Sequence, residues 1–210
     1  MGKVKVSMAM SLDGFVAGPN QSFENPLGEG GMRLHEWLFE LEAFQAEHGG
    51  GGGTTNASTQ IVADLQDAGA HVMGRHMFGG GSGPWDESWK GWWGDEPPYH
   101  GPVFVLTNHP HEPLPMQGGT TFYFVTDGID AALERAREAA GDADVLIAGG
   151  ASVVQQYFAA GLIDEITLSV SPVLLGAGER FFAGGVTGKL EQIAVIEAPG
   201  VTHLRYRVMR

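Results

Sequence analysis

The chain has 210 residues, of which 43% are apolar and 10% aromatic, so it can bury a full hydrophobic core. Its formal net charge of −13 argues against nucleic acid or an anionic membrane surface as a partner. The absence of cysteine excludes disulfides, thiolate metal sites and a cysteine nucleophile.

The N-terminal segment begins with a strand. Lys3–Met10 alternates apolar and polar residues, which is the period of a strand and too short a pattern for a secretory leader. No apolar run reaches the roughly 20 residues that span a bilayer. We therefore expect a cytoplasmic protein. Ser11–Phe23 is rich in Gly, Asn and Pro and is predicted to be a loop.

Two helices are predicted next, separated by glycines. Apolar residues recur at three- and four-residue spacing from Arg33 to His48, the pattern of an amphipathic helix. Gly49–Gly53 has no side chains to pack and is predicted to be a flexible loop or insertion. The second helix is capped by Asn56 or Ser58 and continues to about residue 67.

The rest of the chain alternates strands and helices and then ends in strands. The predicted strands before the last helix are Ala70–Gly74, Pro102–Thr107, Thr121–Val125 and Asp144–Ala148, and the helices are Ile129–Ala140 and Ala151–Ala160. Three more strands follow without a helix between them: Glu165–Leu175, Leu190–Glu197 and Thr202–Met209. This order predicts an α/β fold with a mixed, mainly parallel sheet and antiparallel C-terminal strands, in one domain spanning residues 1–210.

Three of the predicted strands run into glycine or small polar residues. In open α/β sheets the ligand lies beyond the carboxyl ends of the strands, where glycine lets the backbone approach a phosphate. Arg75 could clamp a phosphate with two hydrogen bonds, and Thr107, Asn108 and His109 offer donors to a ribose 2′-phosphate. Gly149-Gly150 alone is more typical of a tight strand-to-helix turn than of a nucleotide-binding loop, and neither a G-x-G-x-x-G nor a Walker A sequence is present.

Together and in this order, the motifs resemble a known family. Ser11-Leu12-Asp13-Gly14-Phe15-Val16-Ala17-Gly18 resembles the S-x-D-G-x-x-A element of the reductase domain of riboflavin-biosynthesis deaminase–reductases and their stand-alone relatives. Met73-Gly74-Arg75-His76-Met77-Phe78 is similar to an element shared with dihydrofolate reductases. Gly161-Leu162-Ile163-Asp164-Glu165 and Pro172-Val173-Leu174-Leu175-Gly176-Ala177-Gly178 resemble a third element of this superfamily.

The resemblance implies a dihydrofolate-reductase-like three-layer α/β/α fold, NADPH as the hydride donor, a small-molecule substrate and a homodimer. It also implies cofactor contacts, which by motif match are Ala9, Gly18, Gly74, Arg75, His76, Thr107, Asn108, His109, Gly149, Gly150, Ala151, Ser152, Val153, Leu175 and Gly176. Two departures bear on the choice between NADPH and NADH. Met77 replaces the family's usual threonine, and Asn108 stands where a basic residue is expected.

Asp13 is the candidate catalytic residue, because it follows the first strand at its carboxyl end. Asp-Gly is also an ordinary turn, and the proton that completes a reduction could come from a carboxyl group or from ordered water. The eight histidines lack metal-site spacing, so no metal is predicted. The tryptophans between residues 85 and 93 could stack a planar ligand or anchor their loop on the core.

The sequence therefore predicts NADPH-dependent reduction of a C=N or C=O bond in a pterin, pyrimidine or related metabolite. Two alternatives keep the fold. One is a nucleotide- or folate-binding protein without turnover, and the other is a dimeric scaffold in which the glycine turns are only structural.

Overall fold

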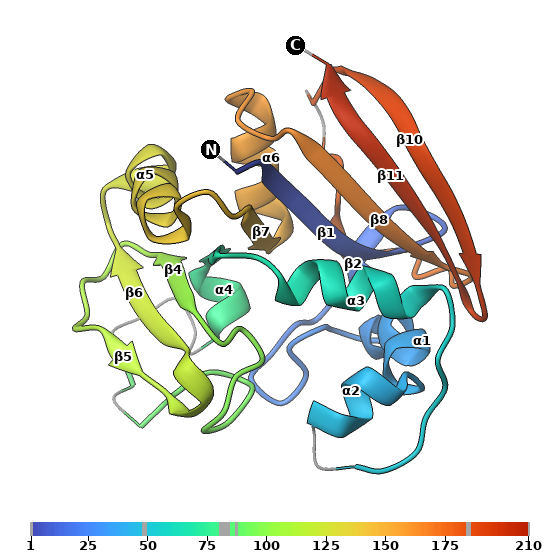
Figure 1. The fold of residues 1–210 in the computed structure, drawn as a ribbon, viewed down its shortest axis with the longest axis horizontal. Helices are drawn as coiled ribbons and strands as arrows, with labels where there is room; N and C mark the ends of the chain where they lie inside the picture. Colours follow the sequence, from blue (N-terminus) through green and yellow to red (C-terminus); the bar gives the residue numbers. More distant parts are fainter. Residues whose placement is uncertain (1, 48–49, 80–84, 87, 184–185, 210) are drawn as a thin grey trace. The chain divides into compact units, whose positions relative to one another are not determined.

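A computed structural model describes residues 2–47, 50–79, 85–86, 88–183 and 186–209 (Figure 1). His48 and Gly49, which end the first predicted helix and begin the glycine tract, lie outside these residues. The chain divides into two compact units. Unit 1 comprises Met1–Val6 and Gln66–Ile163, and unit 2 comprises Ser7–Leu65 and Asp164–Arg210. The strand β1 (Val4–Ser11) contributes residues to both units.

Unit 1 is built on a parallel sheet. Its strand order is β1-β7-β3-β4-β6-β5, where only the two-residue β5 runs antiparallel to its neighbour. These strands are β3 (Ala70–Gly74), β4 (Pro102–Leu106), β5 (Leu114–Pro115), β6 (Thr121–Val125) and β7 (Val145–Gly149). β3 lies between β7 and β4, so it is buried along its whole length, as expected for a central parallel strand.

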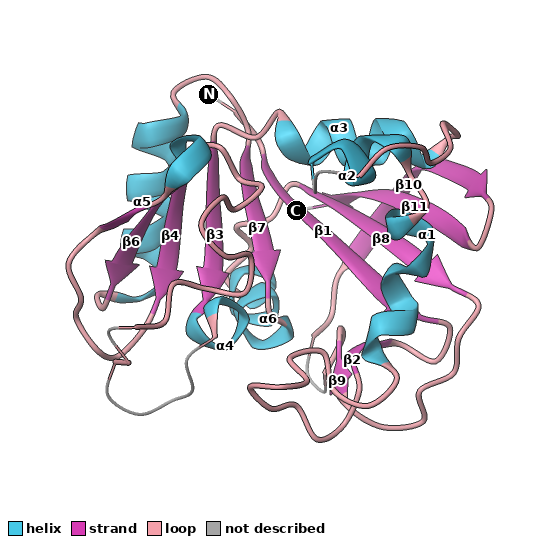
Figure 2. Cartoon of the chain, turned by 90° about the horizontal axis from the view of Figure 1, so that it is seen from below, coloured by secondary structure: helices cyan, strands magenta, loops and turns pink. Residues whose placement is uncertain are grey.

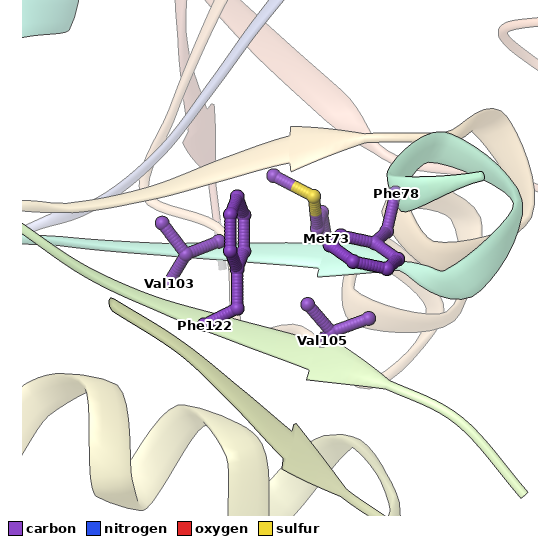
Figure 3. Close-up of a cluster of buried hydrophobic side chains, with 5 residues drawn as sticks. All are labelled: Met73, Phe78, Val103, Val105 and Phe122. Atoms are coloured by element: carbon purple, nitrogen blue, oxygen red, sulfur yellow. The ribbon is translucent and has the colours of Figure 1, made fainter. Parts of the chain in front are cut away.

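The two faces of this sheet are covered differently. Helices α5 (Gly128–Ala140) and α6 (Ala151–Ala159) pack against β3, β4 and β7. Alternate residues of β3, β4 and β6 pack together with Phe78 in a second cluster, whose members are Met73, Phe78, Val103, Val105 and Phe122 (Figure 3). Trp85, Trp89 and Tyr99, from the segment after the short helix α4 (Arg75–Phe78), pack against this cluster. The 3₁₀ turn η2 (Gln117–Gly119) precedes β6.

Unit 2 contains two antiparallel strand pairs, β10–β11 and β11–β8. The order of the sheet here is β10-β11-β8-β1, with β8 (Glu165–Ser171), β10 (Lys189–Ala198) and β11 (Val201–Met209). A separate pair joins β2 (Phe15–Ala17) to β9 (Glu179–Arg180). The helical segments are η1 (Gly31–His35), α1 (Glu36–Phe39), α2 (Glu42–Glu47) and α3 (Ser58–Gln66). Trp37, Leu41, Val62 and Val201 form an apolar cluster in this unit.

The mixed, mainly parallel sheet with flanking helices confirms the predicted α/β class. Two sequence predictions need correction. The helix expected from Arg33 to His48 is interrupted at Leu41, which forms an isolated bridge with Thr54. Thr54 donates its N–H to the Glu40 carbonyl and accepts the N–H of Glu42, so backbone pairing replaces the helical bonds there. The loop expected over Ser11–Phe23 contains β2, which needs its distant partner β9 to form.

A buried histidine that the sequence did not single out lies on β11. The His203 side chain is 0% exposed, and Trp37 contacts its ring edge-on with 5.0 Å between the ring centroids. Its Nε2 lies 2.8 Å from Ser58 Oγ and its Nδ1 lies 2.8 Å from Ser169 Oγ. A neutral imidazole has one donor and one acceptor, and two rotatable hydroxyls satisfy both. This network joins α3, β8 and β11.

Candidate functional site

The carboxyl ends of β3, β4, β6 and β7 point the same way, and α4 and α6 begin just beyond them (Figure 2). Met73 pairs with Gly149 across the β3–β7 ladder, and Gly74 pairs with Leu106 across the β3–β4 ladder. The structure therefore brings together the three predicted strand ends at Gly74, Thr107 and Gly149. This is the edge where open α/β sheets bind ligands.

The turn from β7 into α6 is made by two glycines. Gly149 has a backbone φ of 130°, which residues other than glycine rarely adopt. A cis peptide bond joins it to Gly150. A Cβ built on Gly150 meets no atom within 4 Å. Val153 and Val154 donate their N–H groups to the Gly150 carbonyl, while Ser152 is exposed in the first turn of α6. The first-turn amides of α6 and the space beside Gly150 suit an anion.

Gly74 and Val153 serve packing between β3 and α6. A Cβ on Gly74 would lie 2.8 Å from Val153 Cγ2, and the Val153 side chain is itself buried. The next residue, Arg75, is only 7% exposed, and its guanidinium lies over the Trp85 ring, with Cζ 3.6 Å from the ring centroid. Burial lowers the pKa of Arg75, which still carries its charge at neutral pH. His76 is exposed.

The segment after β4 forms a compact turn. Thr107 Oγ1 accepts the His109 N–H at 3.1 Å, and the Thr107 N–H is donated to the Val125 carbonyl of β6. Trp85 Nε1 lies 3.0 Å from both the His109 and the Pro110 carbonyl oxygens. Asn108 is exposed at the tip of this turn. Thr107 is buried, so its hydroxyl stabilises the turn.

Asp13 lies in unit 2 and holds a loop. Its Oδ1 accepts the Leu175 N–H at 3.1 Å, and its Oδ2 accepts the Gly176 N–H at 2.7 Å. A hydrogen bond from the Ser11 side chain, followed by these backbone bonds, lowers the pKa of Asp13 to about 2. A carboxyl group with this pKa is ionised at neutral pH. Asp13 is therefore a hydrogen-bond acceptor there and not an acid.

Further backbone contacts join the same two segments of unit 2. Leu12 donates its N–H to the Val173 carbonyl, and Phe181 donates to the Gly14 carbonyl. Arg180 lies over the Phe15 ring, with Cζ 4.4 Å from the centroid. The loop after β8 is thus attached to the β1–β2 turn along its length.

The other predicted cofactor residues of unit 2 are glycine turns and strand positions. A Cβ on Gly18 would lie 2.0 Å from the Glu29 carbonyl oxygen, so Gly18 permits close backbone packing. Gly176 is exposed with φ of 74°, and a Cβ there would meet no atom within 4 Å. Leu175 and Ala9 are partly buried, and Ala9 lies within β1.

The family model for the RibD C-terminal domain matches residues 2–202, nearly the whole chain and both units. The chain belongs to the RibD C-terminal domain family. A search of curated proteins found no match. Solved structures of the same fold include a putative riboflavin biosynthesis protein from Shewanella sp. PV-4, with TM-score 0.63, 23% identity and 99% of each chain covered.

Two further structures share this fold with the RibD C-terminal family. A pyrimidine reductase-like protein from Corynebacterium diphtheriae has TM-score 0.57 and 13% identity, covering 100% of this chain and 92% of that one. Dihydrofolate reductase from Enterococcus faecalis, complexed with NADP(H), has TM-score 0.55 and 13% identity, covering 99% and 96%. At these identities the likeness establishes the fold.

Among the described residues of this RibD-family chain, no three His, Asp or Glu side chains gather in a way that could hold a metal ion. Within the same ranges, the helices are too short or too polar to cross a bilayer.

Trp85 is the site residue whose role the sequence left open, because its contacts with Arg75 and with the His109–Pro110 carbonyls depend on the fold. The neighbouring strand ends and the tryptophan-rich segment were the only signals in the sequence.

Proposed function

We propose that this chain is an NADPH-dependent reductase that transfers a hydride to a C=N or C=O bond of a small pterin, pyrimidine or related metabolite. The observation that carries the proposal is the meeting of Gly149-Gly150, Gly74-Arg75 and Thr107 at the carboxyl edge of one parallel sheet. Family membership supports the same chemistry, as do the reductase names of structures that share the fold.

The residues at this edge fit the phosphates of a dinucleotide. A Cβ on Gly150 would project into open space, and the first-turn amides of α6 begin beside it. Arg75 places a cation at the same edge of a chain whose net charge is −13. Arg75 and the amides of Ala151 and Ser152 would hold phosphates, with Thr107 to His109 near the ribose. When bound, the cofactor supplies the hydride.

Asp13 remains our candidate catalytic residue, as an ionised carboxylate that positions the loop at Leu175 and Gly176. Its pKa of about 2 leaves almost no proton on it at neutral pH, so the proton for the reduced centre comes from another carboxyl group or from ordered water. The attachment of Asp13 to this loop also fits a binding protein without turnover. A screen of dihydrofolate, a ribosylaminopyrimidine and simple carbonyl compounds for NADPH oxidation separates a reductase from a binder.

The phosphate site is tested by adding a negative charge to the first turn of α6. We expect Ser152→Glu to weaken NADPH binding about tenfold, because a carboxylate competes with an anion at a helix N-terminus while leaving the helix stable. Ala159→Glu is the matched control, since it adds the same charge to an exposed position at the other end of α6. Fluorescence titration gives both dissociation constants. Equal values for the two variants, or no saturable binding by the wild type at millimolar NADPH, would refute the proposal.

We also propose a homodimer that forms through β10. This strand ends the sheet order, so its outer edge faces no other strand in the described part of the chain. Ile193 is 43% exposed and Val195 is 54% exposed on it. An exposed apolar edge strand is a template for pairing with a second copy. We expect light scattering to give twice the monomer mass for the wild type and one monomer mass for Ile193→Lys/Val195→Lys. Asp67→Lys changes the net charge equally at an exposed site and should remain dimeric.

A further inference from the structure

Trp85 is the residue through which two parts of the proposed phosphate site meet. One face of its indole carries the Arg75 guanidinium, at 3.6 Å from Cζ to the ring centroid. Its Nε1 lies 3.0 Å from each of the His109 and Pro110 carbonyl oxygens. One side chain thus contacts both the end of β3 and the turn after β4.

The contact with Arg75 sets the orientation of a planar cation. A guanidinium makes its hydrogen bonds in its own plane, whereas stacking engages its face. Stacking on an indole therefore restrains the plane in which Arg75 donates, without using the donors. Arg75 is 7% exposed, so few other orientations are open to its side chain.

The contact with the turn restrains the backbone that follows β4. Thr107 Oγ1 accepts the His109 N–H at 3.1 Å, and Trp85 Nε1 donates to the carbonyls of His109 and Pro110. His111 and Phe124 pack edge-on against the same indole, with centroid distances of 5.2 Å and 4.8 Å. One ring therefore contacts both this turn and Arg75.

We propose that Trp85 is a positioning residue for phosphate recognition, which aligns Arg75 and the Thr107–Pro110 turn on one phosphate of the bound dinucleotide. The inference rests on the proposed NADPH site and names the side chain that organises it. Trp85 touches Arg75 and the turn and acts on the ligand through them.

A purely structural role for Trp85 makes a different prediction. Trp85 packs against Phe78 with 6.0 Å between the ring centroids, so its loss also leaves a gap in the apolar cluster of unit 1. Trp89 packs against the same cluster and donates its Nε1 to the Phe78 carbonyl at 3.1 Å. Trp89→Phe is therefore the matched control for lost packing.

The test measures dissociation constants of NADPH, adenosine 2′,5′-bisphosphate and ADP by calorimetry, with thermal unfolding recorded for each variant. We expect Trp85→Leu to weaken NADPH binding about 30-fold and Trp85→Phe about fivefold, because phenylalanine keeps a ring under Arg75 but loses the two hydrogen bonds. Trp89→Phe should change binding less than about twofold. A larger loss for the 2′,5′-bisphosphate than for ADP assigns the phosphate to the ribose 2′ position, and the reverse assigns it to the pyrophosphate.

A double-mutant cycle decides between positioning and packing. If Trp85 acts through Arg75, Trp85→Leu should cost much less binding in an Arg75→Leu background than in the wild type. If Trp85→Leu costs the same NADPH binding in both backgrounds, or if Trp85→Phe and Trp89→Phe weaken binding equally, the inference about Trp85 is wrong. Either result would leave the proposed function standing. Trp85→Phe keeps the test valid if the leucine variant unfolds. A folded wild type that binds neither NADPH nor the 2′,5′-bisphosphate would overturn the inference and the proposed function together.

Discussion

Replacing Asp13 with alanine is expected to lower kcat/KM for the reduction by about 100-fold, because two charge-assisted hydrogen bonds to the loop after β8 are lost. Asp13 accepts the N–H groups of Leu175 and Gly176, and both amides lose their acceptor in the variant. The loop should then move away from the β1–β2 turn. Asp13→Asn should show an intermediate loss. Its side-chain oxygen can still accept one of the two backbone N–H groups, but its NH₂ group faces the other N–H and cannot accept it.

Hydrogen exchange gives a readout that does not depend on activity. In Asp13→Ala, the amides of Leu175 and Gly176 should exchange faster than in the wild type, while amides of β3 and β4 should not change. Asp67→Ala is the control, because it removes an exposed carboxylate and changes the net charge equally. Unchanged exchange at Leu175 and Gly176 would show that Asp13 does not hold the loop. Activity retained down to about pH 4 would agree with a carboxylate whose pKa is about 2.

Acidification is expected to destabilise the protein through His203. Burial lowers the pKa of this histidine from 6.5 to about 4. Between these values the unfolded chain binds a proton that the folded chain does not, so stability is lost as the pH falls from 6.5 towards 4. The full loss is about 3 kcal/mol, since each pKa unit corresponds to about 1.4 kcal/mol.

The His203 contribution is isolated by comparison with His203→Gln, which can hydrogen-bond Ser58 and Ser169 but does not titrate. Urea unfolding at pH 7.5 and pH 4.5 measures the free energy of unfolding of each protein. The wild type should lose about 2.5 kcal/mol more than the variant over this interval. Carboxylates titrate in both proteins, so parallel pH dependence would show that His203 does not contribute.

Segments with strong local signals could be placed from the sequence. The predicted strands at residues 70–74 and 121–125 have the bounds of β3 and β6, and the helix predicted for residues 129–140 differs from α5 by one residue. Apolar runs between turn residues are sufficient for such assignments. Of the two predicted caps, Asn56 and Ser58, the structure selects Asn56, because its Oδ1 accepts the Ser58 N–H at 2.8 Å.

Features that depend on distant partners could not be placed. β5 and β9 have two residues each and exist only because they pair with β6 and β2. The break at Leu41 comes from its pairing with Thr54, against a helical periodicity that continues through it. At the site, the glycines and Arg75 were identified, but the stacking of Arg75 on Trp85 required the packed segment after α4.

By itself, the sequence determined the fold class, the order of the longer strands and helices and the strand ends that bear glycine and small polar residues. It did so because hydrophobic periodicity and turn residues act over a few neighbours in the chain. The tertiary structure alone decided that Asp13 is an ionised carboxylate bonded to the loop after β8, that His203 is buried between two serines and that Trp85 contacts Arg75. Each of these states depends on burial and on partners remote in sequence, and both arise only when the chain packs.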